Sequence, residues 1–274
     1  MSALEAIVLG LVQGLTEFLP ISSSAHVRIV PALFGWEDPG AAFTAVIQIG
    51  TVAAVLLYFR ADLWRIARKM LSSIGDRSLW RTPDHDAKLG WYIVLGTIPI
   101  SVVGLVFKDQ IENEVRSLEL ISTVMIVFSL VLWQADRVGK REREVEQINA
   151  RDGWVIGFAQ ALALIPGVSR SGATISFGLF QGLTRSAAAR YSFLLSVPAV
   201  VLSGLFEFRH IGEEGNTAGF APTAIATVVS FVVGYATIAW LLRYVRNHDF
   251  TIFVAYRVIV GVIILTLAAS GTIN

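Results

Sequence analysis

The chain has no cysteine and few charged residues. Asp, Glu, Lys and Arg make up 16% of its 274 residues, whereas 54% are hydrophobic and the mean hydropathy is +0.64. A soluble domain usually carries about 25% charged residues, so this deficit argues against a soluble enzyme and against a disordered chain. The absence of cysteine excludes a disulfide framework, a thiol nucleophile and a thiolate metal site. The balance of 22 Lys and Arg against 21 Asp and Glu excludes a nucleic-acid binder that relies on bulk positive charge.

The charged residues are concentrated in a few places. Of the 43 charges, 32 lie in five short stretches, 60–89, 108–117, 136–153, 209–220 and 243–250. The segments between them are long and apolar, which is typical of a polytopic membrane protein whose loops hold the charge. The first residues contain no basic cluster, so we expect no cleaved signal peptide.

The apolar segments fall into two kinds. A helix that crosses a bilayer needs about 20 apolar residues. Six segments have this length, about 42–59, 90–107, 118–135, 188–208, 221–242 and 251–270. Two others, about 4–35 and 154–183, are too long for one helix, and proline with small polar residues interrupts each at its centre. We therefore expect an all-α membrane protein with six transmembrane helices and two broken re-entrant helix hairpins.

The basic residues orient these segments. The stretches 60–89, 136–153 and 243–250 hold 14 Lys and Arg, whereas the other two hold 3. The positive-inside rule places the basic stretches in the cytoplasm. Following the chain, the region 154–187 must then enter and leave on the cytoplasmic side. If the first hairpin is also re-entrant, both termini are extracytoplasmic.

The two halves of the chain resemble each other. Each consists of a broken hairpin followed by three spans, and Gly10–Leu15 resembles Gly157–Leu162 at an offset of 147. The predicted orientation of the halves is opposite, which indicates an inverted-topology repeat with its site where the broken helices meet. We expect a single domain, 1–274, with repeats at about 1–135 and about 154–274 joined by the cytoplasmic loop 136–153.

Two charged residues lie close to the proline breaks, one in each half. Glu17 precedes Pro20, and Arg170 follows Pro166. A charged side chain at membrane depth costs at least about 2.5–3.5 kcal/mol, so such residues are functional candidates. His26 follows three serines in the same apolar region. We expect these three side chains to face one another across the repeat.

The residue types favour chemistry at a phosphate. Arg170 presents a planar fork of donors that matches phosphate oxygens, and the helix start near Gly172 adds backbone N–H groups. Ser23 and His26 are three residues apart, so on a helical turn they share a face, which predicts a nucleophile paired with a base. We expect Glu17 either to orient His26 or to hold a divalent cation that bridges phosphates.

Simpler interpretations exist for both motifs. Ser22–Ser24 can cap a helix that starts near Ala25. Pro166–Gly172 can be a plain turn within a broken helix. The occurrence of both motifs at matching places of the repeat favours the functional interpretation.

Three further polar residues lie in apolar segments. Gln13 is one helical turn before Glu17, so the two share a face and Gln13 is predicted to support the site. Gln48 is a weaker candidate for a polar group lining a cavity. Arg257, in the last span, is interpreted as a packing or pairing residue.

Two motifs resemble those of a known family, the undecaprenyl-diphosphatase family of the bacitracin-resistance type. Gln13–His26 resembles its first signature, (Glu/Gln)-x-x-x-Glu followed by Pro-x-Ser-Ser-x-x-His. Pro166–Thr174 matches its second, Pro-Gly-x-Ser-Arg-Ser-Gly-x-Thr. The resemblance covers essentially the whole chain.

The resemblance implies an integral-membrane phosphatase of the bacterial cell membrane. Such an enzyme converts undecaprenyl diphosphate to the monophosphate, which recycles the lipid carrier for peptidoglycan and other cell-wall glycans and confers bacitracin resistance. The resemblance also implies a divalent cation, Mg²⁺ or Ca²⁺, and a site that opens to the extracytoplasmic side. The expected partners are the polyprenyl diphosphate and membrane lipids but no nucleic acid, and a homodimer is left open.

The resemblance also implies roles for individual residues. The implied catalytic residues are Glu17, Ser23, His26 and Arg170. The resemblance implies functional positions at Ser169 and Thr174, which we expect to bind phosphate, and we add Ser22, Ser171 and Gly172 as further phosphate-binding candidates. Which of Ser23 and His26 attacks phosphorus is left open. Glu17 is the candidate metal ligand, and Gln13 stands where many members have Glu and supplies no second carboxylate.

Two other functions are weighed against hydrolysis. A transporter or flippase of a prenyl phosphate is the main alternative, because inverted repeats with broken helices are common in transporters. A lipid phosphatase of the acid-phosphatase-like class is rejected, because no His and Asp follow Ser169-Arg170 as that class requires.

Overall fold

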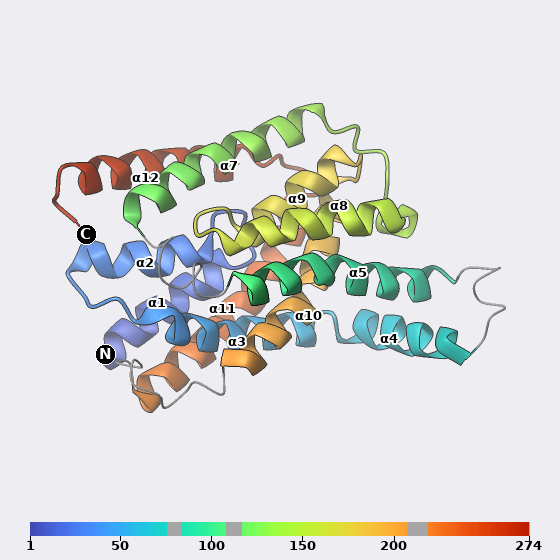
Figure 1. Cartoon of the computed structure of the whole chain (residues 1–274), viewed down its shortest axis with the longest axis horizontal. Coiled ribbons are helices and arrows are strands. Elements are labelled where there is room, and N and C mark those ends of the chain that lie inside the picture. Colours follow the sequence, from blue (N-terminus) through green and yellow to red (C-terminus); the bar gives the residue numbers. More distant parts are fainter. Residues whose placement is uncertain (76–83, 108–116, 208–218, 274) are drawn as a thin grey trace.

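The computed structural model describes residues 1–75, 84–107, 117–207 and 219–273 (Figure 1). No strand occurs among these residues, and helices dominate, which confirms the all-α prediction. In chain order the elements are α1 (Ala3–Thr16), α2 (Ser23–Phe34), α3 (Gly40–Tyr58), α4 (Arg60–Gly75), α5 (His85–Val106), α7 (Leu118–Val138), η2 (Val145–Gln147), α8 (Ala150–Ala161), η3 (Leu162–Leu164), α9 (Arg170–Phe180), α10 (Arg185–Glu207), α11 (Phe220–Tyr244) and α12 (Thr251–Ala269).

Each apolar segment predicted to cross a membrane forms a helix, namely α3, α5, α7, α10, α11 and α12. Within the described ranges, α5, α7, α11 and α12 are long and apolar enough to cross a bilayer. A fifth candidate arises if α3 and α4, which are bent by 79° at the break between them, count as one span. The first turns of α10, which is not in this set, carry Arg185 and Arg190.

One predicted loop is partly helical. We predicted a loop over 60–89, but its first 16 residues form α4 and its end begins α5. Ile66 of α4 is buried near Gly90 of α5, whereas Trp64 on another face of α4 is 72% exposed. Arg60–Gly75 contains no proline, and its charged residues lie on the outer side of an amphipathic helix instead of in an irregular loop.

The stretches 108–117 and 209–220, also predicted as loops, lie almost entirely outside the described residues. The stretch 136–153 contains η2 and the first turn of α8, so the second hairpin begins slightly earlier than predicted.

Both predicted helix breaks are present. The connection from α1 to α2 contains Pro20, and the connection from α8 to α9 contains η3 and Pro166. Proline lacks a backbone N–H and its ring clashes with the preceding turn, which disfavours a continuous helix. Helices continue through Pro31, Pro99 and Pro198, whereas the two breaks also contain a serine with positive φ.

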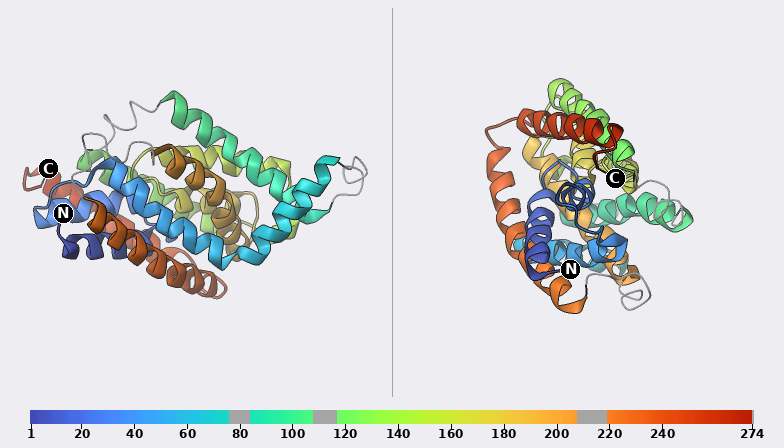
Figure 2. Two further views of the ribbon diagram at one scale, coloured as in Figure 1. Left: turned by 90° about the horizontal axis from the view of Figure 1, so that it is seen from below. Right: turned by 90° about the vertical axis from the view of Figure 1, so that its left-hand side faces the viewer.

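Elements from the two halves of the chain pack against each other. α1 packs on α11, α8 packs on α5, and α7 packs on α12. Two of these contacts need glycine, because a Cβ added at Gly10 would lie 2.6 Å from the carbonyl oxygen of Ala226 and one at Gly157 would lie 2.5 Å from Cα of Gly96. Figure 2 shows the resulting elongated bundle, with both termini at the same end.

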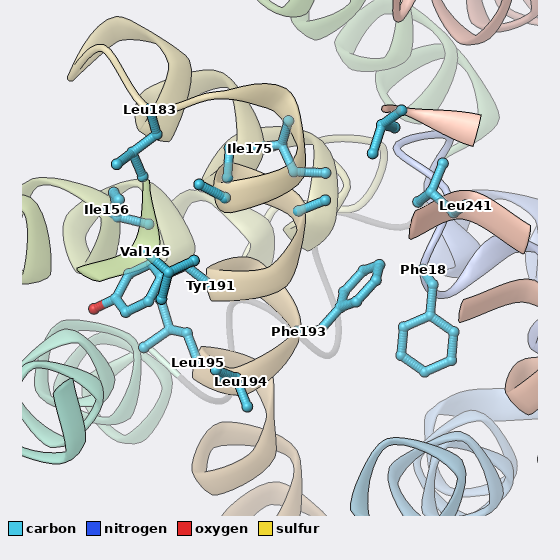
Figure 3. Packing of buried hydrophobic residues seen from close by; sticks show 14 of the residues in the cluster. Phe18, Val145, Ile156, Ile175, Leu183, Tyr191, Phe193, Leu194, Leu195 and Leu241 are labelled. Carbon is cyan, nitrogen blue, oxygen red and sulfur yellow. The ribbon is translucent and has the colours of Figure 1, made fainter. Parts of the chain in front are cut away.

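The largest apolar core surrounds α10 (Figure 3). Phe193 on α10 packs edge-on against Phe18, which follows α1, with ring centroids 5.3 Å apart. The same cluster includes Ile175 of α9 and Leu241 of α11. This core holds the second break close to the end of α1, which brings Glu17 and Arg170 into contact.

The outer faces of the long helices expose aliphatic side chains. Leu105 of α5, Val228 of α11 and Ile259 of α12 are each more than half exposed. Such faces suit a hydrocarbon environment, in which apolar side chains need no cover.

Candidate active site

Both breaks end in a serine with an unusual backbone conformation. Ser22, at the N-cap of α2, has φ 76° and ψ 94°, and Ser169, at the N-cap of α9, has φ 71° and ψ 113°. L-residues rarely adopt these values, and such strained positions often occur at functional sites. Ser171 donates a hydrogen bond of 2.9 Å to the carbonyl oxygen of Leu19, so the start of α9 contacts the first break directly.

Glu17, the residue after α1, is the centre of the cluster. Its Oε1 accepts a 2.6 Å hydrogen bond from the guanidinium of Arg170, which lies 153 residues away. Its Oε2 accepts from the Ser23 hydroxyl at 2.6 Å and from the Gln13 amide at 2.8 Å. The carboxylate is almost completely buried, and 14% of the Arg170 side chain is exposed. The structure therefore brings together the two charged residues that the sequence placed at opposite breaks.

The electrostatics of the cluster suit an anion. Ser23 and Arg170 are the first residues of α2 and α9, so Glu17 lies near two helix N-termini, whose partial positive charge stabilises negative groups. The buried pair has one negative and one positive charge, and breaking such a pair by removing one partner leaves an uncompensated charge.

Two buried polar atoms in this cluster have no partner among the described residues. They are Oε1 of Gln13 and one terminal guanidinium nitrogen (NH1) of Arg170. A buried polar atom without a hydrogen bond costs about 1–3 kcal/mol, so each calls for an explanation. One is a free acceptor and the other a free donor, and both belong to side chains that bind Glu17.

His26 has different partners from those predicted. Its Nδ1 lies 2.8 Å from the Ser22 carbonyl oxygen, and its Nε2 lies 2.8 Å from the Tyr256 hydroxyl. Because a carbonyl only accepts, Nδ1 carries the proton and Nε2 accepts from Tyr256. The predicted pair of Ser23 with His26 is thus replaced by a pair of Ser23 with Glu17. The reason is the break before α2, which directs Ser23 back towards α1 while the His26 ring points towards α12.

The other predicted phosphate ligands lie around the second break. The Ser169 hydroxyl accepts from the Gly172 N–H at 3.1 Å and lies 3.2 Å from the Ser171 hydroxyl, so it caps α9. The Thr174 hydroxyl is buried and lies 2.6 Å from the hydroxyl of Ser192 on α10. Phosphate binding by these residues stays a prediction.

Two supporting residues were also predicted. Gln13 is confirmed as a neighbour of Glu17. Gln48 is half-buried on α3 and makes no described side-chain contact with the cluster. The Ser22 hydroxyl lies 3.3 Å from that of Ser24, so these two serines contact each other.

Two neighbouring residues of α12 were not predicted to reach the site. Tyr256 contacts His26, and its ring lies nearly parallel to the imidazole, with centroids 5.5 Å apart. Arg257 is completely buried and donates to the carbonyl oxygens of Pro20, Gly167, Val168 and Met125. The packing role predicted for Arg257 is therefore correct, and its partners are carbonyl groups. A charge in the middle of the last apolar segment was the available signal, whereas an aromatic residue in such a segment carries none.

The residues present define what kind of cation could bind. No group of three or more His, Asp or Glu side chains suited to a metal occurs in the described part of the chain. Gln13 contacts Glu17 through its amide nitrogen, and its Oε1 has no partner among the described residues, so the two neighbouring side chains carry oxygen atoms, the donor type that Mg²⁺ and Ca²⁺ prefer. This set fits a cation that takes its remaining ligands from water or phosphate.

Comparison with known proteins gives a consistent result. The model of the family described as bacitracin resistance protein BacA matches residues 6–263. An undecaprenyl-diphosphatase of a Nocardioides species is 56% identical over 274 residues, covering 98% of this chain and 98% of that protein. An undecaprenyl-diphosphatase of Kineococcus radiotolerans is 54% identical, covering 100% and 96%, and undecaprenyl-diphosphatase 2 of Streptomyces avermitilis is 50% identical, covering 100% and 97%. These matches confirm the resemblance found in the two motifs.

Proposed function

The chain belongs to the bacitracin resistance protein BacA family, and we propose that it hydrolyses undecaprenyl diphosphate to undecaprenyl phosphate and inorganic phosphate. The observation that carries this proposal is the contact of Ser23, Glu17 and Arg170 where the two broken helices meet. Ser23 supplies a hydroxyl, Glu17 a carboxylate that accepts the hydroxyl proton, and Arg170 a guanidinium whose N–H groups can donate to phosphate. The product recycles the lipid carrier for cell-wall glycans.

Arg170 binds the phosphate in this proposal. One nitrogen of its guanidinium binds Glu17, and the unpartnered nitrogen is free to donate to a phosphate oxygen. Donors held in place before the reaction stabilise the charge that develops on the transferring phosphoryl group. The helix starts at Ser23 and Arg170 add their positive ends on the same side.

The first step is attack by Ser23. Its oxygen forms a bond to the terminal phosphorus, the bond from that phosphorus to the bridging oxygen breaks, and undecaprenyl phosphate leaves. The hydroxyl proton passes to Glu17, to which it already donates at 2.6 Å. We assign the attack to Ser23 and not to His26, and this assignment is supported by the hydrogen bond from the Ser23 hydroxyl to a buried carboxylate.

The second step is hydrolysis of the phosphoserine. A water oxygen bonds to phosphorus as the bond from phosphorus to the Ser23 oxygen breaks, and Glu17 returns its proton to Ser23. The water keeps one proton on the released phosphate and gives the other to the Tyr256 hydroxyl, which passes its own proton to Nε2 of His26. The imidazolium then releases this proton to solvent by the reverse path, which restores the neutral His26 of the resting state.

A divalent cation, Mg²⁺ or Ca²⁺, is part of the proposal. Glu17 and Gln13 would hold it, because they supply adjacent oxygen donors and Oε1 of Gln13 has no partner within the described ranges. Such an ion neutralises charge on the diphosphate oxygens when bound. Because only one carboxylate is present, we expect weak binding in the absence of substrate.

The proposal includes six transmembrane helices and an inverted-topology repeat. It is supported by the pairing of elements, because α1 packs on α11 as α8 packs on α5, and α7 packs on α12. Without α4 and the short 3₁₀ helices, the first half consists of α1, α2, α3, α5 and α7, and the second half of α8 to α12. The first helix of each half packs on the fourth helix of the other half, and the two fifth helices, α7 and α12, pack on each other. The matching backbone of Ser22 and Ser169 supports the same symmetry.

The proposed location is the bacterial cell membrane, with both termini and the site opening on the extracytoplasmic side. The termini lie at one end of the bundle, as an even number of crossings requires (Figure 1). The distribution of Lys and Arg supports this orientation.

A prenyl-phosphate carrier is not favoured. A carrier needs groups that bind phosphate but no nucleophile, whereas Ser23 lies against a buried carboxylate. The relatives reported above are all named diphosphatases.

The test is phosphate release from a long-chain prenyl diphosphate by the purified, detergent-solubilised protein, with and without Mg²⁺ or Ca²⁺. Ser23→Ala and Arg170→Ala are expected to lower turnover at least about 100-fold while remaining folded. The matched controls are Ser24→Ala, one residue along α2, and Arg137→Ala, an arginine that lies over Trp133 at the end of α7. Full turnover by Ser23→Ala would exclude the serine step, and no release by folded wild type would overturn the function.

A further inference from the structure

Two consecutive residues of α12 connect this helix to the site. α12 packs mainly on α7, and its outer face is exposed. Tyr256 nevertheless contacts His26, and Arg257 contacts both breaks. His26 and Pro20 lie about 230 residues earlier in the chain, and Gly167 lies in the second break. The contacts of α12 with the site therefore depend on the assembled fold.

Arg257 fixes the position of α12. Its guanidinium donates to Pro20 in the first break at 3.1 Å and to Gly167 and Val168 in the second at 2.8 and 3.2 Å. The Nε–H of Arg257 also donates to the Met125 carbonyl oxygen on α7, at 3.3 Å. Because one rigid planar group binds three segments, the backbone of α12 at this point has little freedom relative to either break.

Tyr256 therefore presents its hydroxyl at a defined place. The phenol oxygen lies 2.8 Å from Nε2 of His26, and the two rings are inclined by only 12°. His26 is 6% exposed, so Nε2 is shielded from bulk solvent, whereas Tyr256 is 41% exposed on the outer side. Together with the Ser22 carbonyl at Nδ1, the hydroxyl completes the hydrogen bonds of the imidazole.

We propose that Tyr256 holds the imidazole of His26 in place and relays the proton of the attacking water to Nε2, while the Ser22 carbonyl keeps the other proton on Nδ1. This inference rests on the proposed function, in which His26 accepts a proton from water. A hydroxyl both donates and accepts, so the phenol gives its own proton to Nε2 as it takes one from the water, and it stays bonded to Nε2 before and after that transfer. A partner that fixes the orientation and tautomer of a histidine is what a proton-accepting imidazole requires.

The test is Tyr256→Phe, which keeps the ring and removes only the hydroxyl. We expect kcat to fall roughly 10–100-fold, as when a partner that orients a functional histidine is lost. KM should not change, because Tyr256 contacts none of the groups assigned to phosphate. The matched control is Tyr235→Phe on α11, a ring of similar exposure that packs on Tyr58, and it should keep wild-type kcat.

Two readouts separate positioning from a structural effect. Imidazole ¹⁵N shifts of histidine-labelled protein, assigned by comparison with His26→Ala, should show the Nδ1–H tautomer in wild type and in Tyr256→Phe, with the Nε2 shift changed in Tyr256→Phe because Nε2 loses its hydrogen-bond donor. In a His26→Ala background, Tyr256→Phe should have no further effect on kcat, because residues that act together are not additive.

Unchanged kcat and unchanged ¹⁵N shifts in Tyr256→Phe would overturn the proposal, as would the same loss of kcat in both backgrounds. If wild type released no phosphate, the proposed function would fail, and the ¹⁵N shifts would still decide whether the Tyr256 hydroxyl binds Nε2 of His26.

Discussion

Replacing Glu17 by Gln tests whether the buried ion pair both joins the hairpins and serves the reaction. The substitution keeps the size of the side chain, and the amide oxygen of the new Gln can still accept a hydrogen bond from Gln13 or from Ser23. It removes the negative charge that lies 2.6 Å from the Arg170 guanidinium. Leaving one member of a buried pair uncompensated typically costs about 3–5 kcal/mol. Because 14% of the Arg170 side chain is exposed, we expect a value near the lower limit, about 3 kcal/mol.

The assay is thermal unfolding in detergent, followed by tryptophan fluorescence, beside phosphate release. A loss of about 3 kcal/mol corresponds to a Tm lower by about 6–12 °C for a chain of this size class. Phosphate release should fall at least about 100-fold, since the acceptor of the Ser23 proton is gone.

The double variant Glu17→Gln with Arg170→Met separates the two roles of the pair. It removes both charges, so most of the lost Tm should return while phosphate release stays abolished. Glu5→Gln is the matched control, because Glu5 lies in an exposed capping box at the start of α1 and should matter little. The reasoning is refuted if Glu17→Gln keeps the wild-type Tm, or if the double variant is as unstable as the single one.

Further predictions concern packing and the cation. Gly157→Ala places a methyl group 2.5 Å from Gly96 and should lower stability by about 1–3 kcal/mol, whereas Gly104→Ala, whose added methyl has 3.7 Å of clearance, should have little effect on Tm. A Gly157→Ala protein with wild-type Tm would show that α5 and α8 can move apart freely. Chelation of divalent cations should lower phosphate release reversibly, and Gln13→Glu, which supplies a second carboxylate beside Glu17, should reduce the cation concentration needed for half-maximal activity. In Gln13→Glu the Tm should also rise on addition of Mg²⁺ or Ca²⁺, because the ion binds only the folded protein, and a Tm independent of cation would count against this site.

The local features of the fold were predictable from short segments of sequence. Pro20 and Pro166 each stand beside several small polar residues, a combination that favours a break. Proline alone does not end a helix in this chain, because Pro31, Pro99 and Pro198 lie inside helices. The long apolar segments likewise predict helices, because their length and lack of charge leave few other structures. The segment Arg60–Gly75 was misjudged because charge density outweighed its helical periodicity, and only packing on α5 shows which of its faces is buried.

The sequence predicted which residues belong to the candidate site, but it did not predict which of them form hydrogen bonds with one another. Glu17, Ser23, His26 and Arg170 stand out as polar residues at breaks in apolar segments, and that follows from composition and spacing alone. Spacing of three residues suggested that Ser23 binds His26, but the strained turn at Ser22 directs the hydroxyl to Glu17 instead.

The sequence by itself determined the helical class, the breaks and the motifs, because these depend on the backbone and side chains of neighbouring residues. The tertiary structure decided that Arg170 meets Glu17 and that Tyr256 meets His26 across 230 residues. It also decided that Arg257 binds carbonyl groups of both breaks. Such contacts depend on how helices pack, and packing is set by side chains such as Phe18 and Phe193 and by close approaches at Gly10 and Gly157, none of which are local in sequence.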